Sequence, residues 1–238
     1  MPQVISHQEQ LVQAVEFTAQ ELYRASHDYE FFLQNSYTHD PHGMGSEKVK
    51  HFPIDKQYIA ELIKVFTTEN KVAIYKSRQM MVTWTCVAYT LHEVLFEPGS
   101  HIAYISKKEE DAGKLIERAK FIYDRLPENW KMGLPKVDLY YAKKHVPVKM
   151  ILTFSGNTPR SIIQAYPQGG DQVRMETFSH AYWDEVGFCD NQEASATYAA
   201  LKPTIDGGGQ LILCSTPPRD PEHFWEKFVT GRLFESRV

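Results

Sequence analysis

The sequence has few cysteines, no long apolar run and little excess charge. Its 238 residues include only three cysteines, Cys86, Cys189 and Cys214, none of them in a CxxC pair. Scattered thiols of this kind predict neither a zinc site nor a disulfide framework. No run of about 18 apolar residues occurs, so we expect no transmembrane helix and no membrane partner. The net charge of −4 is unlike that of a protein that coats nucleic acid, although a local basic patch can still contact DNA.

What the sequence does contain is an alternation of strand and helix patterns. Apolar runs typical of strands lie at 71–75, 101–106, 150–154, 161–166, 180–184 and 210–215. Helical periodicity is found at 7–35, 55–67, 82–96, 107–127 and 193–203. Asp55 is the expected N-cap of the second of these helices, the runs at 150–154 and 161–166 indicate a hairpin or meander, and 38–48 is typical of a polar turn region. The alternation predicts an α/β fold, with helices on both faces of a mostly parallel sheet that binds its ligand at the carboxyl ends of the strands.

The segment KSRQMMVT (76–83) follows the first of these strands and has the outline of a phosphate-binding loop. A loop of the G-x-x-x-x-G-K-[ST] type surrounds phosphates with backbone N–H groups and adds a lysine and a metal-binding hydroxyl. With Thr83 at the hydroxyl position, Met81 and Val82 replace the glycine and lysine, and Lys76 stands at the first glycine. The main cation would be Lys76 or Arg78. By itself the segment is also typical of an ordinary strand–turn–helix in a core. The candidate phosphate contacts are Lys76, Ser77, Arg78, Gln79, Met80, Met81, Val82 and Thr83.

Two later strand ends carry polar residues suited to nucleotide hydrolysis. In YWDE (182–185), Asp184 can hold Mg²⁺ opposite Thr83, and Glu185 can orient the water that attacks the γ-phosphate. In CSTP (214–217), Ser215 and Thr216 can sense that phosphate and pass its loss to the next segment. Alone, an acidic pair or a Ser/Thr turn before prolines is common at strand ends. The loop upstream favours the functional interpretation of the acidic pair.

Together, KSRQMMVT, YWDE and CSTP resemble the ATPase domain of the large terminase subunit of tailed bacteriophages, along about residues 25 to 235. The resemblance implies a three-layer P-loop NTPase of the additional-strand, RecA-like kind, with a deviant Walker A loop and a Walker B motif. It implies ATP and Mg²⁺ as cofactors, and ATP hydrolysis that drives double-stranded DNA into a procapsid. It also implies a homo-oligomeric ring, contacts with the portal protein and the small terminase subunit, and a place in the host cytoplasm, transiently at the procapsid portal.

The resemblance also assigns roles to particular residues. HFPIDKQY (51–58) places Gln57 where the family has its adenine-contacting glutamine, and CSTP gives Ser215 and Thr216 the family's coupling role. Arg174 stands where some members carry an arginine finger that acts in a neighbouring subunit, with an ordinary surface ion pair as the alternative. Apart from the resemblance, the best local basic patch for DNA contact is formed by Lys143, Lys144 and Lys149.

The implied organisation has three segments. These are an N-terminal helical, lid-associated segment at 1–50, an ATPase core at 51–218 and the start of a C-terminal lid or linker at 219–238. The nuclease domain of full-length large terminases, and with it nuclease activity, is expected to be absent. Two alternatives stay open. A helicase-type or restriction-type translocase would need a second RecA-like domain, and a nucleotide-dead scaffold of the same fold would have no use for Glu185.

Overall fold

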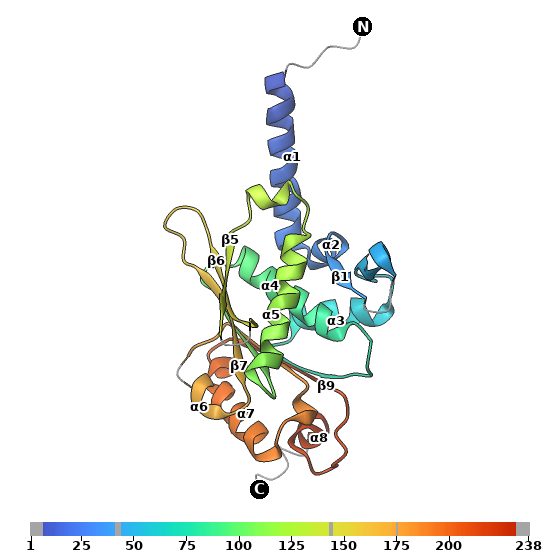
Figure 1. The fold of residues 1–238 in the computed structure, drawn as a ribbon, viewed down its shortest axis with the longest axis vertical. Helices are drawn as coiled ribbons and strands as arrows, with labels where there is room; N and C mark the ends of the chain where they lie inside the picture. Colours follow the sequence, from blue (N-terminus) through green and yellow to red (C-terminus); the bar gives the residue numbers. More distant parts are fainter. Residues whose placement is uncertain (1–6, 41–43, 143–144, 175, 232–238) are drawn as a thin grey trace.

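A central sheet of seven strands organises the part of the chain that the structure describes (Figure 1). The structure is a computed structural model that describes residues 7–40, 44–142, 145–174 and 176–231. The strand order is β3-β9-β8-β4-β7-β6-β5, in which β3, β9, β8, β4 and β7 pair in parallel and β6 and β5 pair antiparallel. The strands are β3 (Lys71–Tyr75), β4 (His101–Ser106), β5 (Lys136–Tyr141), β6 (Pro147–Thr153), β7 (Ser161–Pro167), β8 (His180–Asp184) and β9 (Gln210–Ser215).

Helices cover both faces of this sheet, which confirms the predicted three-layer α/β fold (Figure 1). The apolar side chains on one face pack against α2, α3, α4 and α5, and those on the other face pack against α7 and α8. Successive strand residues alternate between the two cores, as the period of two requires: Tyr182 belongs to the first core and Trp183 to the second. The helices are α1 (His7–His27), α2 (Tyr29–Gln34), α3 (Gln57–Thr68), α4 (Val82–Phe96), α5 (Glu109–Asp124), α6 (Gly170–Val173), α7 (Asn191–Asp206) and α8 (Phe224–Val229).

The N-terminal segment packs directly onto the α4 side of the sheet. The Tyr29 hydroxyl donates a hydrogen bond to the carbonyl of Thr85 at 2.9 Å, and Phe32 packs edge-on against His92 with ring centroids 5.2 Å apart. Ala25, Tyr29 and Phe32 therefore belong to the same buried core as α4. The boundary expected near residue 50 remains a prediction.

Several local expectations differ from the structure, and the helix expected at 7–35 is interrupted at Asp28, between α1 and α2. The helix expected at 55 begins at Gln57, and its N-cap is Lys56 without a side-chain cap bond, so the Asp55 cap is wrong. The turn region expected at 38–48 overlaps β1 (Tyr37–His39) and includes the short helix η1 (Gly45–Lys48), and β1 pairs antiparallel with β2 (Val49–His51), which follows the region. The edge strand β5 was not expected, and α7 continues past Pro203. No helix among the described residues is long and apolar enough to cross a membrane.

Candidate functional site

The three strand ends singled out in the sequence lie side by side in the sheet. β9 pairs with β3 on one side and with β8 on the other, so Lys76, Ser215 and Asp184 all lie at the same edge. The backbone N–H of Lys76 donates to the carbonyl of Ser215 at 3.0 Å, which fixes the start of the phosphate loop against the end of β9. The sheet topology thus brings Lys76 close to residues that follow it by more than 100 positions in the chain.

The phosphate loop adopts left-handed backbone conformations without glycine. Gln79 has φ 64° and Met81 has φ 56°, and Met81 is the N-cap of α4. Such angles cost a residue with a side chain about 1–3 kcal/mol, and they persist where the surrounding structure imposes them. The turn that glycine normally provides is therefore present, although the glycine is not. It places the N-terminal turn of the 15-residue helix α4 at the end of the loop, where free N–H groups attract anions.

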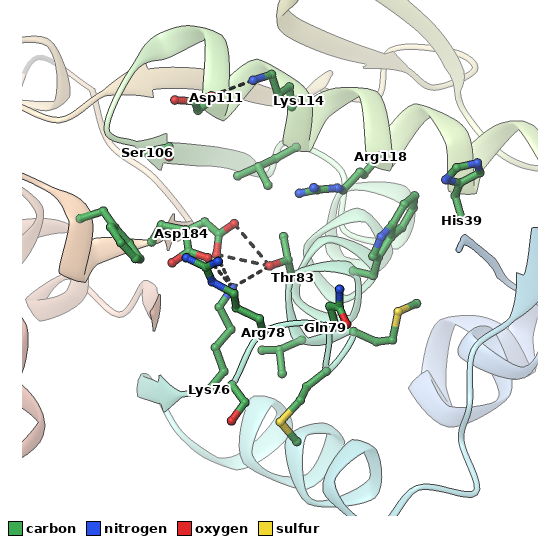
Figure 2. A pocket seen from close by; sticks show the side chains of 18 of the residues that line it. His39, Lys76, Arg78, Gln79, Thr83, Ser106, Asp111, Lys114, Arg118 and Asp184 are labelled. Atoms are coloured by element: carbon green, nitrogen blue, oxygen red, sulfur yellow. Dashed lines mark hydrogen bonds and ion pairs between the residues drawn. The ribbon is translucent and has the colours of Figure 1, made fainter. Parts of the chain in front are cut away.

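The side chain of Lys76 turns back across the loop and makes three polar contacts (Figure 2). Its Nζ lies 2.9 Å from Oγ1 of Thr83, 3.1 Å from Oδ1 of Asp184 and 3.1 Å from Oε1 of Glu185. The Lys76 and Asp184 side chains are only 8% and 10% exposed. Burial by itself lowers the pKa of Lys76, but the negative charges around it, that of Asp184 foremost, raise it above its ordinary value. The ammonium is therefore a fixed positive charge at the entrance of the loop.

The oxygen atoms around this ammonium fit a magnesium site. The Thr83 hydroxyl lies 3.4 Å from both carboxylate oxygens of Asp184, and hydroxyl and carboxylate oxygens are ligands that Mg²⁺ accepts. The described residues contain no cluster of three or more His, Cys, Asp or Glu side chains suited to a metal. Mg²⁺ at a nucleotide site is usually held by one or two carboxylates together with phosphates and waters, so the small donor set is sufficient. The same two side chains also contact Lys76, so the ammonium and a metal ion would compete for them.

Glu185 follows β8 with a left-handed backbone, at φ 56°. One carboxylate oxygen contacts Lys76, and the other, Oε2, is buried without a hydrogen-bond partner among the described residues. The side chain as a whole is 37% exposed and lines the same cavity as the phosphate loop. An acceptor oxygen of this kind can orient a water molecule for attack on a phosphate.

Gly187, for which no sequence pattern predicted a role, joins two strand ends. The N–H of Gly187, in the short helix η3 (Val186–Phe188), donates to Oγ of Ser215 at 2.9 Å. That hydroxyl donates in turn to the carbonyl of Thr216 at 2.8 Å. A Cβ atom at position 187 would lie 2.8 Å from both the Ser215 hydroxyl and the Thr216 carbonyl, so only glycine fits without a shift. The segment after Glu185 is thereby tied to the segment after β9.

A cavity of about 900 Å³ lies over the phosphate loop, and several predicted residues are not part of it. Gln57 is exposed at the start of α3, where its amide donates to Glu61 at 2.9 Å. Arg174 is exposed and lines a separate cavity, and Lys149 lies half-buried on β6. Lys143 and Lys144 lie outside the described residues. The roles given to these residues remain predictions.

The cavity also has a wall that the sequence did not indicate. This wall is formed by His39 from β1 and by Lys114 and Arg118 from α5 (Figure 2). Trp84 from α4 also lines it. The helical spacing of Trp84 favours a core position, and the sequence pattern around His39, Lys114 and Arg118 does not predict that they line this cavity. Their approach is a consequence of how β1 packs on α5 and α5 packs on α4.

Comparison with known proteins gives matches at the level of structure. No protein-family model and no curated protein matches the sequence. The large terminase of bacteriophage HK97 matches with a TM-score of 0.57 and 14% identity, over 87% of this chain and 41% of that chain. The large terminase of a thermophilic bacteriophage matches with a TM-score of 0.56 and 12% identity over 75% of this chain and 43% of that chain. A structure of the latter protein in complex with ATP-gamma-S matches with a TM-score of 0.53 and 14% identity, over 75% of this chain and 42% of that chain.

These likenesses confirm the expected fold. The chain has the three-layer fold that phage large terminases contain, and it spans about two fifths of the length of the two terminases it matches. At identities of 12 to 14%, the likeness is one of architecture.

Proposed function

We propose that the chain is the ATPase part of a phage DNA-packaging motor, which hydrolyses ATP with Mg²⁺ to move double-stranded DNA into a procapsid. The observation that carries the proposal is a set of polar side-chain contacts near the ends of β3 and β8. They join Lys76, Thr83, Asp184 and Glu185, and none is longer than 3.4 Å. A lysine, a hydroxyl and two acids with separate tasks are the parts that phosphoryl transfer requires. The fold shared with large terminases, one of them solved with ATP-gamma-S, supports the choice of nucleotide and of motor.

Lys76 and the N-terminal amides of α4 would bind the phosphates. The ammonium contacts Thr83 and Asp184, and a rotation of its flexible side chain would carry it from these oxygens to the β- and γ-phosphates. Arg78, which is exposed on the loop, would add a second cation. Thr83 and Asp184 would then hold Mg²⁺, which neutralises charge on the phosphate oxygens. The buried ammonium thus keeps the acidic site neutralised until a nucleotide brings its own charge.

Glu185 would orient the attacking water, and its buried Oε2 has no competing partner among the described residues. Arg174 would complete the site of a neighbouring subunit. Its side chain is exposed and does not line the cavity over its own phosphate loop, as an arginine that acts in another subunit requires. Such a residue stabilises the charge of the transition state, and its absence costs roughly 10³–10⁵ in rate.

The Gly187–Ser215 hydrogen bond would couple hydrolysis to movement. A shift of Glu185 on loss of the γ-phosphate displaces Gly187, and the 2.9 Å bond passes that displacement to Ser215 and Thr216. From there it reaches the chain beyond β9. Lys143, Lys144 and Lys149 would contact DNA. A homo-oligomeric ring, the portal protein and the small terminase subunit complete the proposed assembly, in the host cytoplasm and transiently at the procapsid.

The missing loop glycines favour one alternative, a nucleotide-dead scaffold, and hydrolysis by the purified chain decides between the two. We expect slow ATP turnover by the wild type, because an isolated subunit lacks its neighbour's arginine. Glu185→Gln should retain ATP binding and lose roughly 10²–10⁴ in rate, since the water is no longer oriented. The control is Glu117→Gln, an exposed acid on α5, which should leave the rate unchanged. Equal rates for Glu185→Gln and wild type, or a wild type that fails to bind ATP, would contradict the proposal.

The role of Arg174 needs a separate experiment. Arg174→Ala and Glu185→Gln chains are each expected to be inactive, but a mixture at ring-forming concentration should regain part of the activity. In a mixed ring, some sites combine an intact Glu185 with an intact Arg174 from the neighbour. No recovery in an assembled ring would contradict action across the interface.

A further inference from the structure

The cavity over the phosphate loop extends beyond the residues that the proposed chemistry uses. Lys76, Thr83 and Asp184 lie at one end of it. In Figure 2, Arg118 and His39 lie on the side of Thr83 that is remote from Asp184. At about 900 Å³ in total, the cavity has room for more than phosphates and a metal ion.

Flat side chains form this second end. The guanidinium carbon of Arg118 lies 5.7 Å from the centre of the Trp84 ring. Phe121 packs edge-on against both Trp84 and His39, with ring centroids 5.5 Å and 5.9 Å apart. Phe121 is not among the residues that line the cavity, so it supports Trp84 and His39 from behind, while Trp84, Arg118 and His39 face the open space. Guanidinium planes and aromatic rings of this kind are surfaces on which nucleic-acid bases stack.

The position of Trp84 in the chain connects the two ends. Trp84 follows Thr83 directly and lies in the first turn of α4, whose free N–H groups bind the phosphates in the proposed mechanism. The part of a nucleotide that extends from those phosphates can therefore leave the loop beside Trp84. By contrast, Gln57 does not line this cavity, and its amide already donates to Glu61.

We propose that this end of the cavity is the base subsite, in which a purine base stacks on the Arg118 guanidinium with His39 as the opposite wall. The proposal rests on the proposed function, because it needs a nucleoside triphosphate on the phosphate loop. It places the base on α5 and β1 instead of at Gln57. Stacking provides affinity for the base, so the subsite distinguishes a nucleoside triphosphate from inorganic tripolyphosphate, which has phosphates but no base.

The chain contains a natural fluorescent reporter for this subsite. Of its four tryptophans, Trp130, Trp183 and Trp225 are fully buried at 0% exposure, whereas Trp84 is half-buried and lines the cavity. Addition of ATP should change the tryptophan fluorescence, and tripolyphosphate at saturation should change it much less. Trp84→Phe should abolish the change caused by ATP. A fluorescence change that persists in Trp84→Phe would contradict the proposed position.

Binding measurements on Arg118 variants test the stacking itself. We expect Arg118→Ala to weaken ATP binding roughly 10-fold and to leave tripolyphosphate binding unchanged. Arg118→Lys, which retains the positive charge but lacks the planar guanidinium on which a base can stack, should behave like Arg118→Ala. The matched control is Arg125→Ala: that guanidinium also stacks on Phe121, at 3.6 Å, but does not line the cavity. Unchanged thermal unfolding midpoints would show that the variants fold.

The outcomes separate this proposal from the function on which it rests. Equal losses of ATP and tripolyphosphate affinity in Arg118→Ala would show a purely electrostatic role and overturn the base subsite. A loss of ATP affinity alone in Gln57→Ala, with Arg118→Ala unaffected, would place the base at Gln57. In both cases the ATPase proposal stands. A wild type that binds neither ligand overturns both.

Discussion

The buried charge cluster predicts that Lys76→Met is strongly destabilising before any nucleotide is added. Methionine has a similar length and fills the space of the lysine stem, so the change removes mainly the charge. Asp184, 10% exposed, and Glu185 then remain without their cation, which lay 3.1 Å from each carboxylate. At an effective dielectric constant of about 20, a 3.1 Å pair attracts by about 5 kcal/mol, and desolvation offsets part of this. We expect the free energy of unfolding to fall by about 3–5 kcal/mol.

The stabilisation that Lys76 provides should not depend on pH near neutrality. The raised pKa of Lys76 in the folded chain means that its contribution is fully present below the unfolded pKa of about 10.4. That contribution is lost only when pH rises through the folded pKa, so it should not change between pH 5 and pH 8.

Urea unfolding of the nucleotide-free chain at pH 5 and pH 8 measures both effects. The double variant Lys76→Met/Asp184→Asn removes both charges of the pair, and should recover about 2–4 kcal/mol relative to the sum of the single changes. The control is Lys114→Met, which removes an exposed pair with Asp111 at 2.8 Å and should cost about 1 kcal/mol or less. A Lys76→Met variant no less stable than Lys114→Met, or losses that simply add in the double variant, would refute the reasoning.

Three further predictions concern single contacts, and all can be measured by urea unfolding. Met81→Gly relieves a left-handed backbone and should raise the free energy of unfolding by about 1 kcal/mol, whereas Met80→Gly should lower it; equal effects would show that Met81 is unstrained. Tyr166→Phe removes a buried hydroxyl without a partner among the described residues and should be neutral or stabilising; a large loss would reveal a hydrogen bond to that hydroxyl. Gly187→Ala pushes a Cβ against Ser215 and should cost about 1–3 kcal/mol, while no loss would mean that the two segments are not held together.

The sheet centre could be predicted from the sequence because its strands are continuous apolar runs. β4, β8, β9 and α4 have the expected bounds, since a strand buried on both faces leaves little choice of residue type. The edge strand β5 was missed because charged and exposed positions interrupt its pattern. The Asp55 cap failed because the helix begins at Gln57, one residue later than a cap at Asp55 requires.

The residues of the candidate site also fall into two groups, those that the sequence predicted and those that it did not. Lys76, Thr83, Asp184 and Glu185 lie directly beside strand ends, so the rule that parallel sheets bind ligands there was enough to find them. His39 and Arg118 reach the cavity through packing between elements that are distant in sequence, which no local pattern records. The left-handed loop was also hidden, because the motif expects glycine where Met81 is found and accepts any residue at the position of Gln79.

We propose that Lys76, at the entrance of the loop, replaces the lysine that phosphate loops normally carry. Calorimetric measurement of ATP affinity in the presence of Mg²⁺, for the wild type, Lys76→Ala and Arg78→Ala, decides whether it does. The geometry predicts a loss of roughly 100-fold or more for Lys76→Ala, whose ammonium is buried beside Thr83 and Asp184, and a smaller loss for the exposed Arg78. Wild-type affinity in Lys76→Ala, with binding abolished in Arg78→Ala, would contradict the claim and make Arg78 the phosphate-binding cation.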